Sequence, residues 1–293
     1  MGRLTMRRPV RRITVDAGET RRVDTLAVEE PLEIRVGGEP LSVTMRTPGH
    51  DVELAAGFLV SEGVISRGDQ FRSAIHCGGP GTGGAENTYN VLDIALASHV
   101  HVPIRDLARS VYTTSSCGVC GKASIDAVRT ESAYDVATDA TTDATTVDAS
   151  LLATLPDALR AHQDVFDKTG GLHAAGLFDA ETGELLVLRE DVGRHNAVDK
   201  VVGWALLADR LPLRATVLMV SGRAGFELAQ KSVMAGIPIL AAVSAPSSLA
   251  VELAVDAGLT LVGFLRGPSM NVYAGMERVR VDAAAPVAVE GRA

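Results

Sequence analysis

Two patterns of hydrophobic and polar positions divide this chain, and the change falls near residue 169. Upstream, short alternating stretches follow a basic start, residues 1–12, that we expect to be frayed. The predicted strands are 10–15, 32–36, 41–45 and 90–97, the middle two as a hairpin around Gly37-Gly38. Apolar residues at helical spacing predict helices over 52–61, with Asp51 as its N-cap, and over 151–166.

Downstream of residue 169, short apolar strands alternate with amphipathic helices. The predicted strands are 172–178, 185–188, 216–220, 237–243 and 259–265, and the predicted helices are 195–208, 226–235 and 247–257. This alternation is typical of βαβ units. The sequence therefore predicts an α/β fold with a mixed, largely parallel sheet and helices on both faces, beside a smaller N-terminal α+β region.

An acidic segment of low complexity, residues 134–149, separates the two patterns and predicts a linker. The expected organisation is an N-terminal α+β region over 1–133 that ends in a thiol loop, this linker, an α/β domain over 150–282 and a tail over 283–293.

Composition narrows the class of protein. The chain has 293 residues, 46% of them hydrophobic, and 28 basic against 36 acidic residues give a net charge of −8. This balance argues against a general nucleic-acid binder. Three cysteines do not make a disulfide scaffold, and no apolar run is long enough to be a signal peptide or a membrane span. We expect a cytoplasmic protein.

Polar residues follow the predicted strands of the C-terminal half. They are Arg194-His195-Asn196, Ser221-Gly222-Arg223, Ser244–Ser248 and Arg266–Ser269. Ligands of open parallel sheets bind beyond the carboxyl ends of the strands, and arginines and helix N-termini match phosphate groups. The pattern predicts a site for a large phosphorylated ligand, such as a nucleotide-bearing cofactor. No P-loop motif is present.

His173 lies in the run Thr169-Gly-Gly-Leu-His173-Ala-Ala175, which is similar to the H-x-E motif of zinc deaminases. Ala175 stands where that motif has glutamate, so the proton shuttle of a deaminase is missing. Two roles stay open for His173, contact with a ligand and a hydrogen bond to the backbone at a strand end.

Cys117 and Cys120 form a C-x-x-C among small and hydroxylated residues, which is typical of an exposed loop. Zinc would need four ligands, and only His76 and Cys77 could complete the set. Thioredoxin-like redox chemistry and a buried structural pair are two further roles that stay open for these thiols. Covalent carriage of sulfur is favoured, because Lys122 and the start of a predicted helix stabilise a thiolate. Cys77 is interpreted as a free structural thiol.

Seven blocks of the chain resemble the FdhD family, the formate dehydrogenase accessory sulfurtransferases. They are Thr47–Phe58, Ser115–Gly121, Thr169–Ala175, Glu190–Lys200, Ser221–Arg223, Ser244–Ser248 and Gly263–Arg266. The resemblance implies a cytidine-deaminase-like larger domain and a homodimer. It also implies transfer of sulfur, as a cysteine persulfide, from a cysteine desulfurase to the molybdenum bis(molybdopterin guanine dinucleotide) cofactor before that cofactor enters formate dehydrogenase.

The resemblance also implies site residues. Cys117 matches the persulfide carrier and Cys120 its partner. The matching cofactor-binding segment is Phe264, Leu265, Arg266, Gly267, Pro268 and Ser269. The strand ends add the candidate cofactor contacts His173, Arg194, His195, Asn196, Ser221, Gly222 and Arg223. No metal of the protein's own is expected. Two rival functions are a non-catalytic, cofactor-binding chaperone of formate dehydrogenase and a zinc-binding module.

Overall fold

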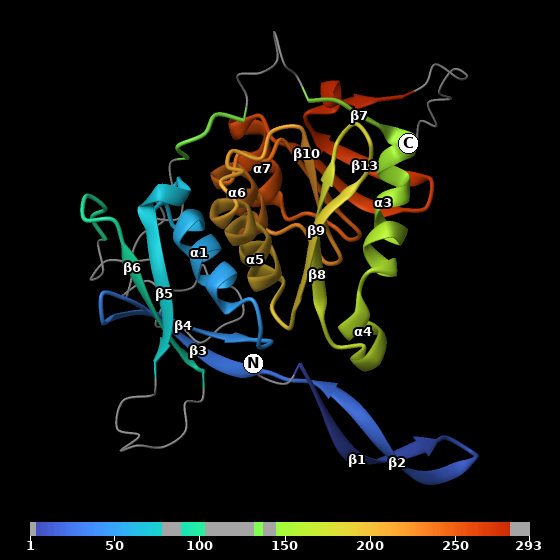
Figure 1. The fold of residues 1–293 in the computed structure, drawn as a ribbon. Helices are drawn as coiled ribbons and strands as arrows, with labels where there is room; N and C mark the ends of the chain where they lie inside the picture. Colours follow the sequence, from blue (N-terminus) through green and yellow to red (C-terminus); the bar gives the residue numbers. More distant parts are fainter. Residues whose placement is uncertain (1–3, 78–88, 103–131, 137–144, 282–293) are drawn as a thin grey trace.

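Two sheets with helices between and around them form most of the described chain (Figure 1). This computed structural model describes residues 4–77, 89–102, 132–136 and 145–281. Cys117 and Cys120, with the loop around them, lie outside the described residues.

The larger sheet has six strands in the order β13-β12-β11-β10-β8-β9. Their bounds are β8 His173–Asp179, β9 Leu185–Asp191, β10 Thr216–Val220, β11 Ile239–Ala242, β12 Thr260–Arg266 and β13 Ser269–Ala274. Only the pairings β10–β11 and β11–β12 are parallel, whereas the other three are antiparallel. The mixed α/β class is confirmed, but the prediction of a largely parallel sheet is wrong. Hairpin turns at both ends of the sheet, β8–β9 and β12–β13, reverse the chain direction.

Helices cover both faces of this sheet, as predicted. One face carries α5 (Arg194–Leu207), α6 (Phe226–Met234) and α7 (Ser248–Ala257), and the other carries α3 (Ala149–Ala161), which is followed by α4 (Asp164–Thr169). Successive strand residues point to opposite faces. Leu218 of β10 therefore joins the cluster under α5 and α6, while its neighbours Val217 and Met219 pack under α3. The deaminase-like arrangement implied by the resemblance stays a prediction.

The smaller sheet has four strands in the order β4-β3-β6-β5 and packs on the outer side of α1 (Asp51–Ser61). Its strands are β3 Glu30–Val36, β4 Glu39–Arg46, β5 Phe71–Cys77 and β6 Val91–Leu96. The predicted hairpin β3–β4 and the predicted strand at β6 are confirmed. Cys77, the last residue of β5, is a free thiol.

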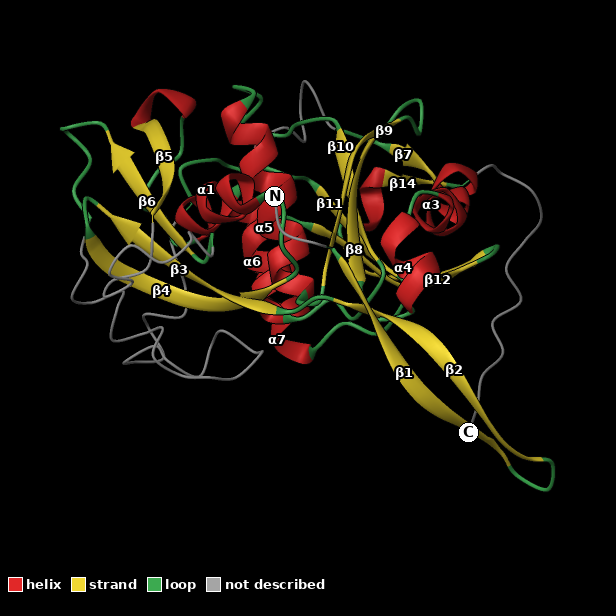
Figure 2. Ribbon diagram, turned by 60° about the horizontal axis from the view of Figure 1, so that its bottom comes forward, coloured by secondary structure: helices red, strands yellow, loops and turns green. Residues whose placement is uncertain are grey.

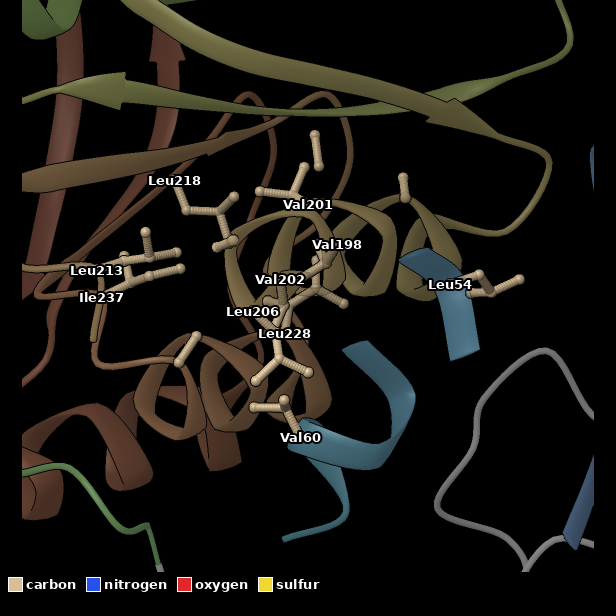
Figure 3. Packing of buried hydrophobic residues seen from close by; sticks show 14 of the residues in the cluster. Leu54, Val60, Val198, Val201, Val202, Leu206, Leu213, Leu218, Leu228 and Ile237 are labelled. Carbon is tan, nitrogen blue, oxygen red and sulfur yellow. The ribbon is translucent and has the colours of Figure 1, made fainter. Parts of the chain in front are cut away.

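Helices α1 and α5 lie against each other between the two sheets. A Cβ placed on Gly57 of α1 would be 1.8 Å from the carbonyl oxygen of Asp199, and one on Gly203 of α5 would be 1.8 Å from that of Glu53. The two backbones thus meet where neither residue has a side chain. Figure 3 shows Leu54 and Val60 of α1 beside the α5 side chains of one continuous core. The smaller sheet is fixed to the larger one through this contact.

A projecting hairpin precedes both sheets. It consists of β1 (Thr5–Thr14) and β2 (Gly18–Ala27), which pair with each other and with no other described strand. The prediction of a frayed start is wrong from Thr5 onward, and β2 is absent from the predicted strands. Two short strands, β7 (Val147–Asp148) and β14 (Val279–Arg280), pair in parallel beside α3, and 3-10 turns occupy Gly68–Gln70 and Met276–Arg278.

Several helix boundaries differ from the predictions. Asp51 does not cap α1. It is the first residue of that helix, and its carboxylate binds the buried Arg46 through contacts of 3.0 and 3.1 Å. The single helix predicted over 151–166 is two helices, α3 and α4, which are separated at Gln163. The predicted capping of α7 by serine is confirmed, because Ser247 accepts a hydrogen bond from the amide of Ala250.

Two further features concern the predicted linker and the membrane. Val136 and Val147, near the ends of the acidic segment, are both buried. Within the described ranges, no helix has the length and apolar character needed to cross a membrane.

Candidate functional site

One edge of the larger sheet gathers most of the polar residues that the sequence singled out. Strands β9, β10, β11 and β12 all run in the same direction, so their carboxyl ends meet at this edge. Strand β8 runs the opposite way, and its first residue, His173, therefore lies opposite Asp191 at the end of β9. The expectation that the strand-end loops come together is confirmed.

Main-chain hydrogen bonds link these loops in series. Ser221 donates its amide to the carbonyl oxygen of Ala174 (3.0 Å), and Ser244 donates to that of Gly222 (3.3 Å). Phe264 in turn donates to the carbonyl oxygen of Ser244 (3.2 Å). Backbone groups build most of this frame, and the hydroxyl of Ser221 adds to it by accepting a hydrogen bond from the amide of Ala174 (2.9 Å).

His173, Gly222 and Arg194 converge at the centre of the edge. A Cβ on Gly222 would lie 3.4 Å from Nδ1 of His173 and 4.0 Å from Cδ of Arg194, so glycine permits this close approach. Burial, followed by the positive charge of Arg194, lowers the pKa of His173 below its ordinary value. The imidazole is therefore neutral near pH 7 and can either donate or accept one hydrogen bond.

Asn196 serves the fold of this edge. Its side-chain nitrogen donates to the carbonyl oxygen of Met45 (2.8 Å) and to the buried carboxylate of Asp191 (3.0 Å). Asp191 also binds Nζ of the buried Lys200 at 2.7 Å. The amide nitrogen of Asn196 thus joins β4 to α5 and β9, and its contact with a cofactor stays a prediction.

His195 lies on the inner side of α5 and contacts α6. Its Nε2 atom is 2.5 Å from the carboxylate of Glu227, and both side chains are about one-sixth exposed. Next to it, Nε of Arg194 is buried and has no hydrogen-bond partner among the described residues. Arg194 is therefore the better placed of the two for a ligand, because His195 already has a charged partner.

The predicted cofactor segment Phe264–Ser269 forms the end of β12 and its turn into β13. Phe264 has a positive φ of 52° and an exposed ring, while the next residue, Leu265, is buried in the core. Arg266 is exposed and donates from Nε to the carbonyl oxygen of Val243 (3.1 Å). Gly267, Pro268 and Ser269 are exposed. The segment thus offers a phenyl ring and a guanidinium group at the edge, whereas Leu265 contributes only to packing.

A cavity of about 560 Å³ opens beside this edge, between the sheet and the α3–α4 corner. Its lining comprises Pro156, Leu159, Arg160, Gln163, Phe166, Gly170, Gly171, Leu172, His173, Ser221 and Val243. Glu190 fixes α4 over the cavity by accepting hydrogen bonds from the amides of Val165 (2.9 Å) and Phe166 (2.8 Å).

Gln163 is the most informative residue of the lining. It is only 3% exposed and lines the cavity. It is also the N-cap residue of α4, and its side chain makes no capping hydrogen bond to that helix. Together with Arg160, His173 and Ser221, it gives a largely apolar cavity four polar groups, which suits a flat heterocyclic ligand.

The edge therefore brings together His173, Arg194, Ser221, Gly222 and Arg266, and Arg223 is exposed on the loop after β10. The persulfide candidates Cys117 and Cys120 lie outside the described residues. Within the described ranges, no group of three or more His, Cys, Asp or Glu residues could hold a metal ion.

Two residues of this region were missed from the sequence. Gln163 follows Leu152, Leu155 and Leu159 on the same helical stripe, so a polar residue on an apolar stripe was an available signal. Glu227, the partner of His195, carried no such signal, because acidic residues are common in the first turn of a helix.

Comparisons with known proteins identify the family to which this chain belongs. The model of the FdhD/NarQ family matches residues 27–280. The chain is 62% identical over 285 residues to the "Sulfur carrier protein FdhD" of Streptomyces avermitilis, covering 97% of this chain and 99% of that protein. It is 57% identical over 281 residues to the protein of the same name from Mycobacterium tuberculosis, covering 95% and 100%.

A solved structure shares the fold. It is described as a formate dehydrogenase accessory protein from Desulfotalea psychrophila, and it superposes with a TM-score of 0.72 at 23% identity, covering 95% of this chain and all of that one. The family match and the curated relatives, both nearly full-length, lead to one conclusion. This chain is a member of the FdhD/NarQ family.

Proposed function

We propose that this protein carries sulfur for the maturation of formate dehydrogenase. In this proposal, Cys117 accepts a sulfane sulfur from a cysteine desulfurase, and the sulfur passes to a bound molybdenum bis(molybdopterin guanine dinucleotide) before that cofactor enters the enzyme. The protein acts in the cytoplasm as a homodimer. The relatives named for sulfur carriage support the general role.

The observation that carries the proposal is the shared sheet edge with its adjoining cavity. Arg194, Arg223 and Arg266 supply guanidinium groups for the phosphates of the cofactor. His173, Ser221 and Gln163 face an apolar cavity that fits a heterocyclic ring of the same molecule. A large ligand with both phosphates and flat rings matches this combination better than a small anion does.

The sulfur chemistry requires two thiols. The Cys117 thiolate attacks the outer sulfur of the desulfurase persulfide, and the desulfurase thiolate leaves. Cys120 then attacks the inner sulfur of the Cys117 persulfide, which forms a Cys117–Cys120 disulfide and releases hydrosulfide to the metal. The Cys120 thiolate supplies the electron pair of the new disulfide bond, and the pair of the broken sulfur–sulfur bond leaves with hydrosulfide. The cysteine pair is thereby oxidised by two electrons as the sulfane sulfur is reduced. A dithiol reductant then restores the pair.

Mass spectrometry tests the first step. After incubation with a cysteine desulfurase and cysteine, the peptide that contains residues 113–122 is expected to gain one sulfur atom, roughly 32 Da. Cys117→Ala should abolish the gain. Cys120→Ser should retain it but should no longer release hydrosulfide. Absence of any gain on the wild-type peptide would refute the persulfide mechanism.

Two measurements distinguish sulfur carriage from its rivals. If Cys117→Ala still supported full formate dehydrogenase activity in cells, the protein would be a non-catalytic chaperone of the cofactor. If protein purified without chelators held one equivalent of zinc that Cys117→Ala and Cys120→Ser both removed, the thiols would form a zinc site instead.

A further inference from the structure

The hairpin of β1 and β2, residues Thr5–Ala27, is named the arm here. Its strands form ten consecutive cross-strand pairs, from Thr5–Ala27 to Thr14–Gly18, so it extends for about 33 Å. It is attached only at its base, where Val28 donates its amide to the carbonyl oxygen of Leu4 (3.0 Å) and β2 contacts α4. Figure 2 shows the arm leading away from the remainder of the protein, here called the body.

The arm exposes apolar side chains on both of its faces. Met6 and Leu26, which lie opposite each other, are 42% and 43% exposed. On the other face, Val23 is 56% exposed and lies opposite Pro9, and Ile13 nearer the tip is 62% exposed. A two-stranded hairpin alone is at best marginally stable in water. A regular hairpin of this length therefore calls for a surface that covers it.

The net charge of the arm indicates the charge of the surface that covers it. The arm has six arginines against three acidic residues, a net charge of +3, so the remaining residues of this −8 chain carry −11. Arg11 and Arg21 lie directly opposite each other, a like-charge pair that is unfavourable, and within the arm only Arg11 of the two forms a described ion pair, with Glu19 at 3.2 Å. Arg7, Arg8 and Arg12 make no ion pair with any described residue. An acidic surface is thus the complement of the arm.

We propose that the arm docks on the body of a second copy of this chain, and that two copies exchange arms about a two-fold axis. The inference rests on the homodimer of the proposed function and assigns the element that forms it. If the arms of two copies paired with each other, two segments with a net charge of +3 would come together. An arm that docks on the body of the other copy instead brings a net charge of +3 to one of −11. In a reciprocal exchange, the arm of each copy is covered by the body of the other, and the same isologous contact forms twice about the two-fold axis.

The arm also emerges beside the candidate site. Ala27 at its base lies next to Gly171, where a Cβ on the glycine would be 3.8 Å from that of Ala27, and Gly171 lines the cavity. The base of the arm and the cavity of the same copy are thus neighbours.

Sedimentation of the full chain tests the exchange. The wild-type protein is expected to sediment at twice its 30.6 kDa at micromolar concentration. Arg12→Glu/Arg21→Glu should weaken the dimer by about tenfold or more, most strongly at low salt. Arg67→Glu/Arg72→Glu makes the same charge change outside the arm and serves as the matched control, with dimer affinity unchanged. A monomeric wild type, or an arm variant that dimerises as tightly as the wild type, would overturn the proposal.

Photo-crosslinking locates the contact. Benzoylphenylalanine at Val15, which is 82% exposed at the tip, is placed in a mixture of ¹⁵N-labelled and unlabelled protein. Links between the arm of one isotope and the body of the other are expected. Links confined to one isotope, or from arm to arm, would contradict the exchange.

Sulfur loading of the 113–122 peptide separates this proposal from the proposed function. A wild-type dimer that exchanges arms but gains no sulfur would refute only the persulfide mechanism.

Discussion

At the scale of single residues, Gln163 offers a direct test of the proposed ligand site. It lies at the break between α3 and α4, lines the cavity and makes no side-chain capping hydrogen bond to α4. We expect Gln163→Leu to weaken binding of guanosine diphosphate, used as a fragment of the cofactor, by about 5- to 100-fold, because one or two hydrogen bonds are lost. Calorimetric titration measures the change.

A matched control is available on α6. Gln230 is also buried, and its Nε2 atom lacks a partner in the described chain, but it does not line the cavity. Gln230→Leu should leave the affinity for guanosine diphosphate unaltered. Equal affinities of Gln163→Leu and wild type would show that the amide does not contact this ligand.

The same scale shows what the sequence could and could not predict about the site. The strand-end pattern correctly brought Ser221 and Gly222 to one edge, because these residues follow the buried strand β10. It could not distinguish a side chain that faces a ligand from one that serves the fold. Asn196 is engaged with Met45 and Asp191, partners 151 and 5 residues away, and no spacing rule reveals the first of them.

At the scale of elements, the contact of α1 with α5 depends on two glycines. We expect Gly57→Ala and Gly203→Ala each to lower the free energy of unfolding by about 3 kcal/mol or more, because the new methyl group would overlap a backbone carbonyl that cannot move alone. Urea denaturation followed by circular dichroism measures the loss.

Gly225→Ala is the comparison for this prediction. Gly225 has an ordinary φ of −81°, and no atom lies within 4 Å of a Cβ placed there. Its substitution should change the stability by less than about 1 kcal/mol. If Gly57→Ala changed the free energy of unfolding as little as Gly225→Ala, the helices α1 and α5 would have to lie farther apart than they do in this structure.

Elements with continuous apolar runs were predicted well, and those without such runs were missed. Strand β10 agrees with the predicted range at both ends because all five of its residues are buried. Strand β2 exposes seven of its ten residues and strand β13 buries only one of its six, so neither has a run of apolar, buried positions that a sequence pattern could reveal. The break at Gln163 was missed because the leucines before it continue the helical period.

At the scale of the whole molecule, one core spans both sheets. Leu32 and Ile34 of the smaller sheet belong to the same buried cluster as Leu218 and Leu240 of the larger one. We therefore expect the two sheets to unfold in a single transition. Fluorescence of the sole tryptophan, Trp204 on α5, should give the same urea midpoint as far-ultraviolet circular dichroism.

Separate midpoints would contradict this expectation and would make the sheets independent units. Amide hydrogen exchange gives a second readout. If the two sheets unfold in one transition, the amides of β6 and of β11 should exchange with the same global free energy. The linker predicted over 134–149 had suggested two regions, yet the helical contact at Gly57 and Gly203 is what joins them, and only the folded backbone reveals it.

The main-chain bonds that link Ser221, Ser244 and Phe264 have an entropic consequence. Loops that are already ordered lose little conformational freedom when a ligand arrives, so the affinity gained from each contact is not spent on ordering the chain. The side chains on this frame can also change without dismantling it, because the hydrogen bonds belong to peptide groups that every residue except proline provides. The edge is therefore a preorganised platform on which specificity can change while the architecture persists.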